Sequence, residues 1–127
     1  KKVIFIKADI TRPWNFSERT YDLVTFSLVL EHIEDLQDIL KKVAVVTHKG
    51  STVYIGELHP FRQYTGSKAK FETENGLQEL TTFTHHVSHF LNAAFSAGFS
   101  LVQFREFFDE DNPGGTPRIL GLLFGKK

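Results

Sequence analysis

The stretch that decides the fold is YDLVTFSLVLEHIEDL, Tyr21–Leu36. An apolar run over residues 23–30 stops abruptly in four titratable side chains, Glu31, His32, Glu34 and Asp35. Apolar runs with little alternation are typical of parallel strands that are covered on both faces. The run is therefore predicted to be a buried strand that leads either into a solvated helix start or into a site.

A helical pattern follows this strand. Apolar residues recur at three- and four-residue steps over residues 36–46, which indicates an amphipathic helix. Glu34 and Asp35 suit the positive end of that helix, so no chemistry is assigned to them. Gly50 fits the left-handed position after the helix, and Ser51–Leu58 is predicted as the next strand.

The flanking regions extend the pattern in both directions. Val3–Ile10 is β-branched and aromatic, and is predicted to be a buried strand. Helical spacing returns over residues 84–98, with Thr84 as N-cap and Gly98 as the stop. Leu101–Phe108 and Arg118–Gly125 are the last two strands, and the turn-forming DEDNPGGTP between them predicts an antiparallel hairpin at the sheet edge.

Strands that alternate with helices define the fold class. They predict an α/β, Rossmann-like, mostly parallel sheet with helices on both faces and a C-terminal antiparallel hairpin. Ligands of such sheets bind outside the carboxyl ends of the strands. That rule selects Asp9, the turn over Ser27–His32 and Glu57–Pro60.

A long polar segment, residues 59–83, interrupts the regular pattern. A connection of this length in a small domain is usually functional or contains small elements of its own. We therefore expect a variable substrate-side loop or lid there.

Composition limits the function classes. The 127 residues suffice for one domain, and 15 basic residues balance 15 acidic ones, which argues against a nucleic-acid partner. The chain has no cysteine and no apolar run long enough for a bilayer, so we expect a cytoplasmic protein with no membrane partner. The HHVSH stretch, residues 85–89, is interpreted as a solvated helix face, because no third metal ligand is evident.

Three stretches taken together resemble the class I S-adenosylmethionine-dependent methyltransferases, closest to the small-molecule type 11 and type 12 groups. They are ADI (residues 8–10), Tyr21–Leu36 and HKGSTVYIGEL (residues 48–58). The terminal hairpin is also similar, since the family's sheet ends in a reversed strand. The family's glycine-rich cofactor loop is not in this sequence. The resemblance therefore implies that residues 1–127 are the C-terminal part of a single methyltransferase-like domain, a partial fold.

The resemblance implies that S-adenosyl-L-methionine is the cofactor. Asp9 would accept a hydrogen bond from the adenine amino group, and the backbone of Ile10 would contact the adenine ring. Ser27 and Leu28 would line the methionine end of the cofactor. The alternatives are an Asp9 that caps its own turn, and ordinary packing for Ser27 and Leu28.

The candidate catalytic residues are His32 and Glu31, which lie next to the expected methyl group. Histidine titrates near neutral pH and could take a proton from the acceptor, although a structural histidine that orders the loop is the alternative. The expected substrate-binding residues are His59, Tyr64 and Phe71. These side chains could equally well form a turn or anchor the loop.

The resulting hypothesis is transfer of a methyl group from S-adenosylmethionine to a small-molecule acceptor by in-line displacement. The alternative is a truncated, non-catalytic binding or scaffold module that pairs through its open sheet edge, for which we expect a homodimer. A nucleotide-binding oxidoreductase would share the architecture, because fold does not determine function.

Overall fold

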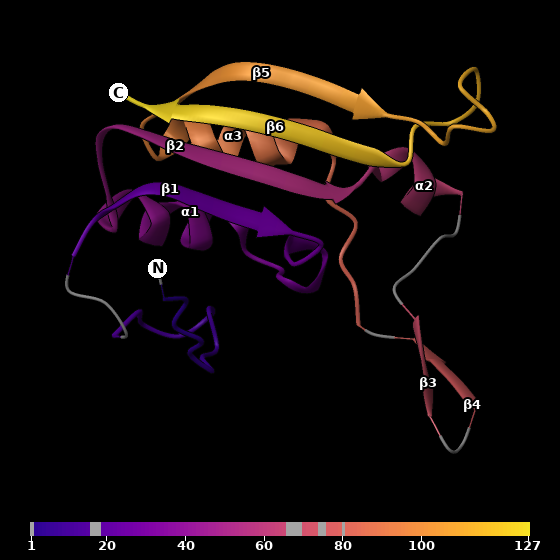
Figure 1. Ribbon diagram of the computed structural model, residues 1–127, viewed down its shortest axis with the longest axis horizontal. Helices are drawn as coiled ribbons and strands as arrows, with labels where there is room; N and C mark the ends of the chain where they lie inside the picture. Colours follow the sequence, from indigo (N-terminus) through magenta and orange to yellow (C-terminus); the bar gives the residue numbers. More distant parts are fainter. Residues whose placement is uncertain (1, 16–18, 66–69, 74–75, 80) are drawn as a thin grey trace.

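The computed structural model describes residues 2–15, 19–65, 70–73, 76–79 and 81–127 (Figure 1). Of the side chains between residues 66 and 80, nothing is described.

A four-stranded mixed sheet in the order β1-β2-β6-β5 forms the centre of the structure. β1 (Tyr21–Ser27) pairs in parallel with β2 (Thr47–Leu58), and β6 (Ile119–Lys126) is antiparallel to both β2 and β5 (Phe99–Phe107). The α/β class and the C-terminal hairpin are thus confirmed, with β5 as the outermost strand of that hairpin.

Two long helices, α1 (Leu36–Val45) and α3 (Val87–Ser96), pack against each other and against the sheet (Figure 1). Both lie on one face, whereas the sequence predicted helices on both faces. On the opposite face Leu23 is 57% exposed, because no helix of the described residues covers it. None of the helices in the described part of the chain is long and apolar enough to cross a membrane.

Alternation along the strands places the core between the sheet and the two helices. Val53 and Ile55 of β2 are fully buried, as is the matching set on β6, Leu120, Leu122 and Phe124. These side chains meet the apolar stripe of α1, whose Ile39 and Leu40 are also fully buried. The helical period predicted for residues 36–46 is confirmed by this packing.

The predicted strand over Val3–Ile10 is wrong. This segment forms no strand, and its apolar side chains from Val3 to Ile6 are exposed, with Phe5 at 92%, while Ile10 is half-buried against the core. An isolated strand leaves its backbone without hydrogen-bond partners, so it forms only beside another strand. Within the described residues, nothing pairs with residues 3–9 or with the outer edge of β1.

The remaining boundaries differ from the predictions by a few residues. β1 ends at Ser27, and the 3₁₀ turn η1 (Leu30–His32) takes the end of the apolar run. α3 has His86, not Thr84, as its N-cap. Gly50 has φ of 91°, which confirms its left-handed backbone, but α1 already ends at Val45 and Gly50 lies within β2. Gly98, with φ of 94°, follows the C-cap Ala97 of α3 as the predicted stop.

The long segment contains small elements of its own. α2 (Pro60–Tyr64) follows β2 directly. β3 (Lys70–Thr73) and β4 (Gly76–Glu79) form a separate two-stranded antiparallel hairpin. Figure 1 shows this hairpin away from the main sheet. One of the two outcomes expected for residues 59–83 is therefore confirmed, while its role beside a substrate stays a prediction.

Candidate functional site

The candidate site is the turn after β1, Ser27–Ile33, which we call the corner. It lies at the sheet edge where both parallel strands, β1 and β2, end (Figure 1). Leu28 has φ of 55°, and its amide donates to the Gly56 carbonyl at 2.9 Å. A left-handed conformation in a residue other than glycine costs about 1–3 kcal/mol and persists only where the surroundings enforce it. The corner is therefore held in shape by its neighbours.

Glu57, near the end of β2, fixes the corner through hydrogen bonds. Its side chain is buried, with 1% of the residue exposed. The carboxylate oxygens accept hydrogen bonds from the Val29 amide at 3.1 Å and from the Leu30 amide at 3.0 Å. Burial raises the pKa of Glu57, and the backbone hydrogen bonds oppose that rise. The sequence placed Glu57 at the end of this strand but suggested no role for it. Glu57 alternates in step with the buried Val53 and Ile55, and this spacing could have indicated that its side chain is buried.

The last residues of the long segment, together with the two that follow it, also contact the corner. We call Thr81–His85 the strap. The Thr81 carbonyl accepts from His32 Nδ1 at 2.9 Å, and the Phe83 amide donates to the Glu31 carbonyl at 2.7 Å. No sequence signal pointed to these contacts, because they join residues about 50 positions apart.

His85 completes the strap. Its Nε2 donates to the Ile33 carbonyl at 2.6 Å, and burial lowers the pKa of the imidazole. A neutral imidazole still carries one N–H group, which is enough to donate to the Ile33 carbonyl. The bond to Ile33 is therefore compatible with the lowered pKa of His85.

The contact with Thr81 determines the tautomer of His32. A carbonyl oxygen can only accept, so Nδ1 carries the hydrogen and the neutral ring keeps its lone pair on Nε2. Nε2 lies 3.6 Å from Glu31 Oε1, too far for a hydrogen bond. The His32 side chain is partly exposed. Its Nε2 is therefore able to accept a proton from a ligand at this edge.

Glu31 contributes a second proton acceptor. Its side chain is largely buried, and Oε2 has no hydrogen-bond partner among the described residues. Buried polar atoms are nearly always hydrogen-bonded, so an exception calls for an explanation. An N–H or O–H group of a ligand would satisfy it.

The expected cofactor residues fall into two groups. Ser27 and Leu28 stand at the sheet edge, and Leu28 is 51% exposed, which leaves room for a ligand against the corner. Asp9 lies in the segment without a strand. Its Oδ1 accepts from the Thr11 amide at 3.0 Å and the Thr11 hydroxyl at 2.6 Å, and these bonds lower the pKa of Asp9.

Ile10 is held on α1 rather than at the edge. Its carbonyl accepts from Trp14 Nε1 at 2.9 Å and from Lys42 Nζ at 3.2 Å. The described residues leave Leu28 exposed at the corner and do not bring Asp9 and Ile10 to the sheet edge. The cofactor roles of all four residues stay predictions.

Two of the expected substrate residues, His59 and Tyr64, lie just after the end of β2. His59 is buried; its Nδ1 accepts from the Phe61 amide at 3.1 Å and its Nε2 donates to Glu106 Oε2 at 2.6 Å. The Tyr64 hydroxyl is hydrogen-bonded to His86 Nδ1. The Phe71 side chain lies outside the described residues. No contact here tests the binding roles of these three residues.

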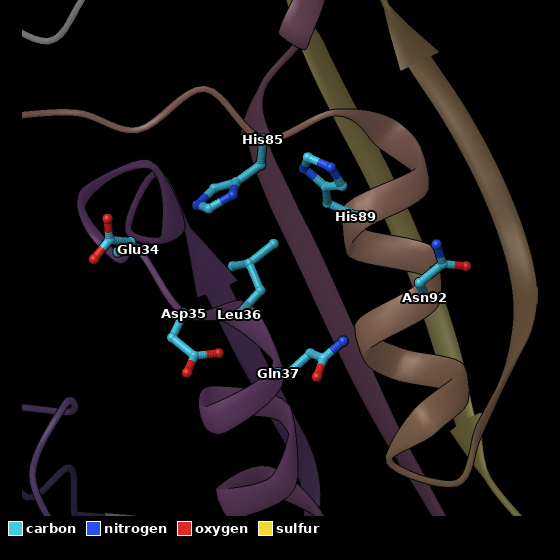
Figure 2. Close-up of a pocket in the computed structure, with 7 residues that line it drawn as sticks. All are labelled: Glu34, Asp35, Leu36, Gln37, His85, His89 and Asn92. Atoms are coloured by element: carbon cyan, nitrogen blue, oxygen red, sulfur yellow. The ribbon is translucent and has the colours of Figure 1, made fainter.

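A hollow of about 440 Å³ lies between the starts of α1 and α3. Figure 2 shows the His85 ring directed toward the loop of Glu34, while His89 stands on α3 across from the start of α1. In the part of the chain that the structure describes, no cluster of histidine and acidic side chains is arranged to hold a metal ion.

Comparisons with known proteins agree with this architecture. Residues 1–55 match a family model described as a methyltransferase domain. A putative S-adenosylmethionine-dependent methyltransferase from Listeria monocytogenes has 16% identity and a TM-score of 0.70, over 85% of this chain and 62% of that one. One from Mesorhizobium loti has 17% identity and a TM-score of 0.71, over 94% and 68%.

A third structure has S-adenosylmethionine bound. It is magnesium protoporphyrin IX methyltransferase from Synechocystis, at 12% identity and a TM-score of 0.58, over 97% of this chain and 45% of that one. The chain spans less than two thirds of the Listeria protein. No curated protein has a significant sequence match. The resemblance to class I S-adenosylmethionine-dependent methyltransferases is confirmed at the level of fold, and the chain has part of that fold.

Proposed function

We propose that this chain serves in methyl transfer from S-adenosylmethionine to a small-molecule acceptor. The observation that carries the proposal is the corner: His32 Nε2 is a partly exposed proton acceptor at the carboxyl edge of the sheet, and the neighbouring Glu31 Oε2 is buried without a hydrogen-bond partner among the described residues. The cofactor bound in a similar fold supports S-adenosylmethionine as the methyl donor. A cytoplasmic location stays part of the proposal.

Each residue has a defined task in this proposal. Ser27 and Leu28 line the methionine end of the cofactor, which supplies a sulfonium methyl group for in-line displacement. Asp9 and Ile10 hold the adenine once their segment reaches the sheet edge. The corner must keep the acceptor aligned, because displacement at carbon depends on the line of approach.

Glu31 and His32 act on the acceptor. Glu31 Oε2 accepts a hydrogen bond from an N–H or O–H group of the methyl acceptor and so orients that molecule. His32 Nε2 takes the proton that the attacking atom loses, which adds rate only where that atom carries a proton. His59, Tyr64 and Phe71 form the side of the acceptor pocket that belongs to residues 59–83.

Isothermal titration of the chain with S-adenosylmethionine, followed by mass spectrometry of acceptor mixtures, tests the proposal. We expect cofactor binding and an acceptor that gains one methyl group. Ser27→Trp fills the edge beside the expected methionine end and should abolish binding, whereas the exposed Val45→Trp on α1 should not. Equal binding by both variants, or no transfer by the whole protein, would contradict the proposal.

A second candidate is a module that associates through β1. No described residue pairs with the outer edge of this strand, and Leu23 and Phe5 are exposed. Unpaired strand edges favour association with another strand. Light scattering after gel filtration should then show a homodimer that Leu23→Lys disrupts and Val45→Lys does not. A monomer at all concentrations would rule this candidate out.

A further inference from the structure

A second hollow lies along the same sheet edge, and neither the sequence nor the comparisons assign it a ligand. It measures about 590 Å³. Its lining comes from α2, from the end of β5 and from the link into β6: Phe61, Glu106, Phe108 and residues 114–117. We call it the outer hollow.

Strand register places the outer hollow within reach of the corner. Glu57 pairs with Leu120, and Leu120 pairs with Glu106, so the three residues form one row across the sheet. Two strand spacings separate the Cα atoms of Glu57 and Glu106 by about 10 Å. Since Glu57 binds the corner directly, a small molecule could contact both places.

The lining combines aromatic rings with one negative charge. Phe61 and Phe108 are 53% and 41% exposed, so both rings offer an aromatic surface to a ligand. Among the described residues that line the outer hollow, Glu106 is the only one with a charged side chain.

The nearby Arg62 and Arg118 form ion pairs with Asp109 and not with Glu106. Arg62 Nη2 donates to Asp109 Oδ2 at 2.9 Å and to the Thr116 carbonyl at 3.3 Å, and Arg118 Nη2 binds the same Asp109 oxygen at 3.1 Å. These contacts leave the negative charge of Glu106 without an arginine partner.

His59 orients the Glu106 carboxylate. Because the Phe61 amide donates to His59 Nδ1, the ring hydrogen is on Nε2, which donates to Glu106 Oε2 at 2.6 Å. The bond uses one oxygen. Among the described residues nothing donates to the other oxygen, Oε1, which is left for a ligand.

We propose that the outer hollow binds the ammonium group of a cationic organic amine, the acceptor molecule of the proposed methyl transfer. Aromatic faces attract cations, and the Glu106 carboxylate supplies the opposite charge. The same charge disfavours anionic acceptors at this place. That the bound molecule is the methyl acceptor rests on the proposed function. That it is a cation rests only on the residues of the outer hollow.

The test uses the whole chain and two probes that share a benzyl group: benzyltrimethylammonium, a permanent cation, and benzyl alcohol, which is neutral. Amide shifts in two-dimensional NMR locate each probe. We expect the cation to shift the amides of residues 114–116 and to bind more tightly than the alcohol. Glu106→Gln should weaken it about two- to fivefold, since the amide keeps an acceptor for His59 but loses the charge.

Two further variants sharpen the result. Phe108→Leu keeps apolar volume without a π face and should weaken the cation a few-fold, whereas the exposed Glu110→Gln is the matched control and should change nothing. Equal affinity for both probes, equal effects of Glu106→Gln and Glu110→Gln, or shifts confined to other residues would overturn the inference. Cation binding without methyl transfer would leave it standing and reject the proposed function instead.

Discussion

The Leu30 amide donates to Glu57 Oε1 at 3.0 Å, across 27 positions of sequence. Through this bond the end of β2 holds the turn that follows β1. The other Glu57 oxygen binds Val29 next to it, and the left-handed Leu28 comes just before. The shape of the candidate site thus depends on a residue that is not itself part of the corner.

Removal of the Glu57 carboxylate should destabilise the protein. Glu57→Ala leaves two amides of the corner without acceptors, each worth about 1–3 kcal/mol, so we expect a loss of about 2–6 kcal/mol in the free energy of unfolding. Glu57→Gln keeps one acceptor and should lose less. Urea unfolding measures both, with the exposed Glu110→Ala as control; a Glu57→Ala variant as stable as this control would refute the role of Glu57.

The stability contributed by Glu57 should depend on pH in the direction opposite to an ordinary surface acid. Burial raises its pKa above the model-compound value of 4.5, so the folded state binds more protons than the unfolded state above that pH. The contribution is fully present below pH 4.5 and is lost as the pH rises through the folded pKa. Wild-type stability relative to Glu57→Gln should therefore fall as the pH rises from 4.5 toward neutrality in paired melting curves. A difference that does not change with pH would contradict this.

The strap should strengthen as His85 loses its proton. Burial lowers the pKa of His85 below 6.5, so the unfolded chain binds more protons near that pH. The contribution of the neutral ring is present above pH 6.5 and is lost as the pH falls through the folded pKa. His85→Phe keeps a ring against Phe90 but not the bond to Ile33, and its melting temperature should lack this pH dependence. Val45→Phe, at an exposed site without a titratable side chain, serves as the control.

His32 should affect rate far more than stability, because its side chain is partly exposed. In a methyl-transfer assay with an acceptor that carries a proton at neutral pH, His32→Gln should lower kcat about 10²–10⁴-fold, the range for loss of a general base. His48→Gln should leave kcat unchanged. A His32→Gln enzyme with wild-type kcat and an unaltered pH profile would assign His32 to holding the strap alone.

The sequence by itself determined most elements of the sheet and its helices. Apolar runs and their periods located β1, β2, β5 and β6 and the helical face of α1, because side-chain spacing reflects local backbone geometry. The rule for parallel strands also led to Glu31 and His32. Periodicity failed at Val3–Ile10, since an apolar run becomes a strand only beside a partner strand.

Tertiary structure alone decided how the corner is held and which atoms remain available. Thr81, Phe83 and His85 reach it from about 50 residues away, and Glu106 meets His59 across 47. Local propensity carries no information on such pairs, because their hydrogen bonds depend on strand order and on the path of the connecting chain. The strand predicted from Tyr21–Leu36 thus came from the sequence, while the free Nε2 of His32 and the unpaired Oε2 of Glu31 came from the packing around it.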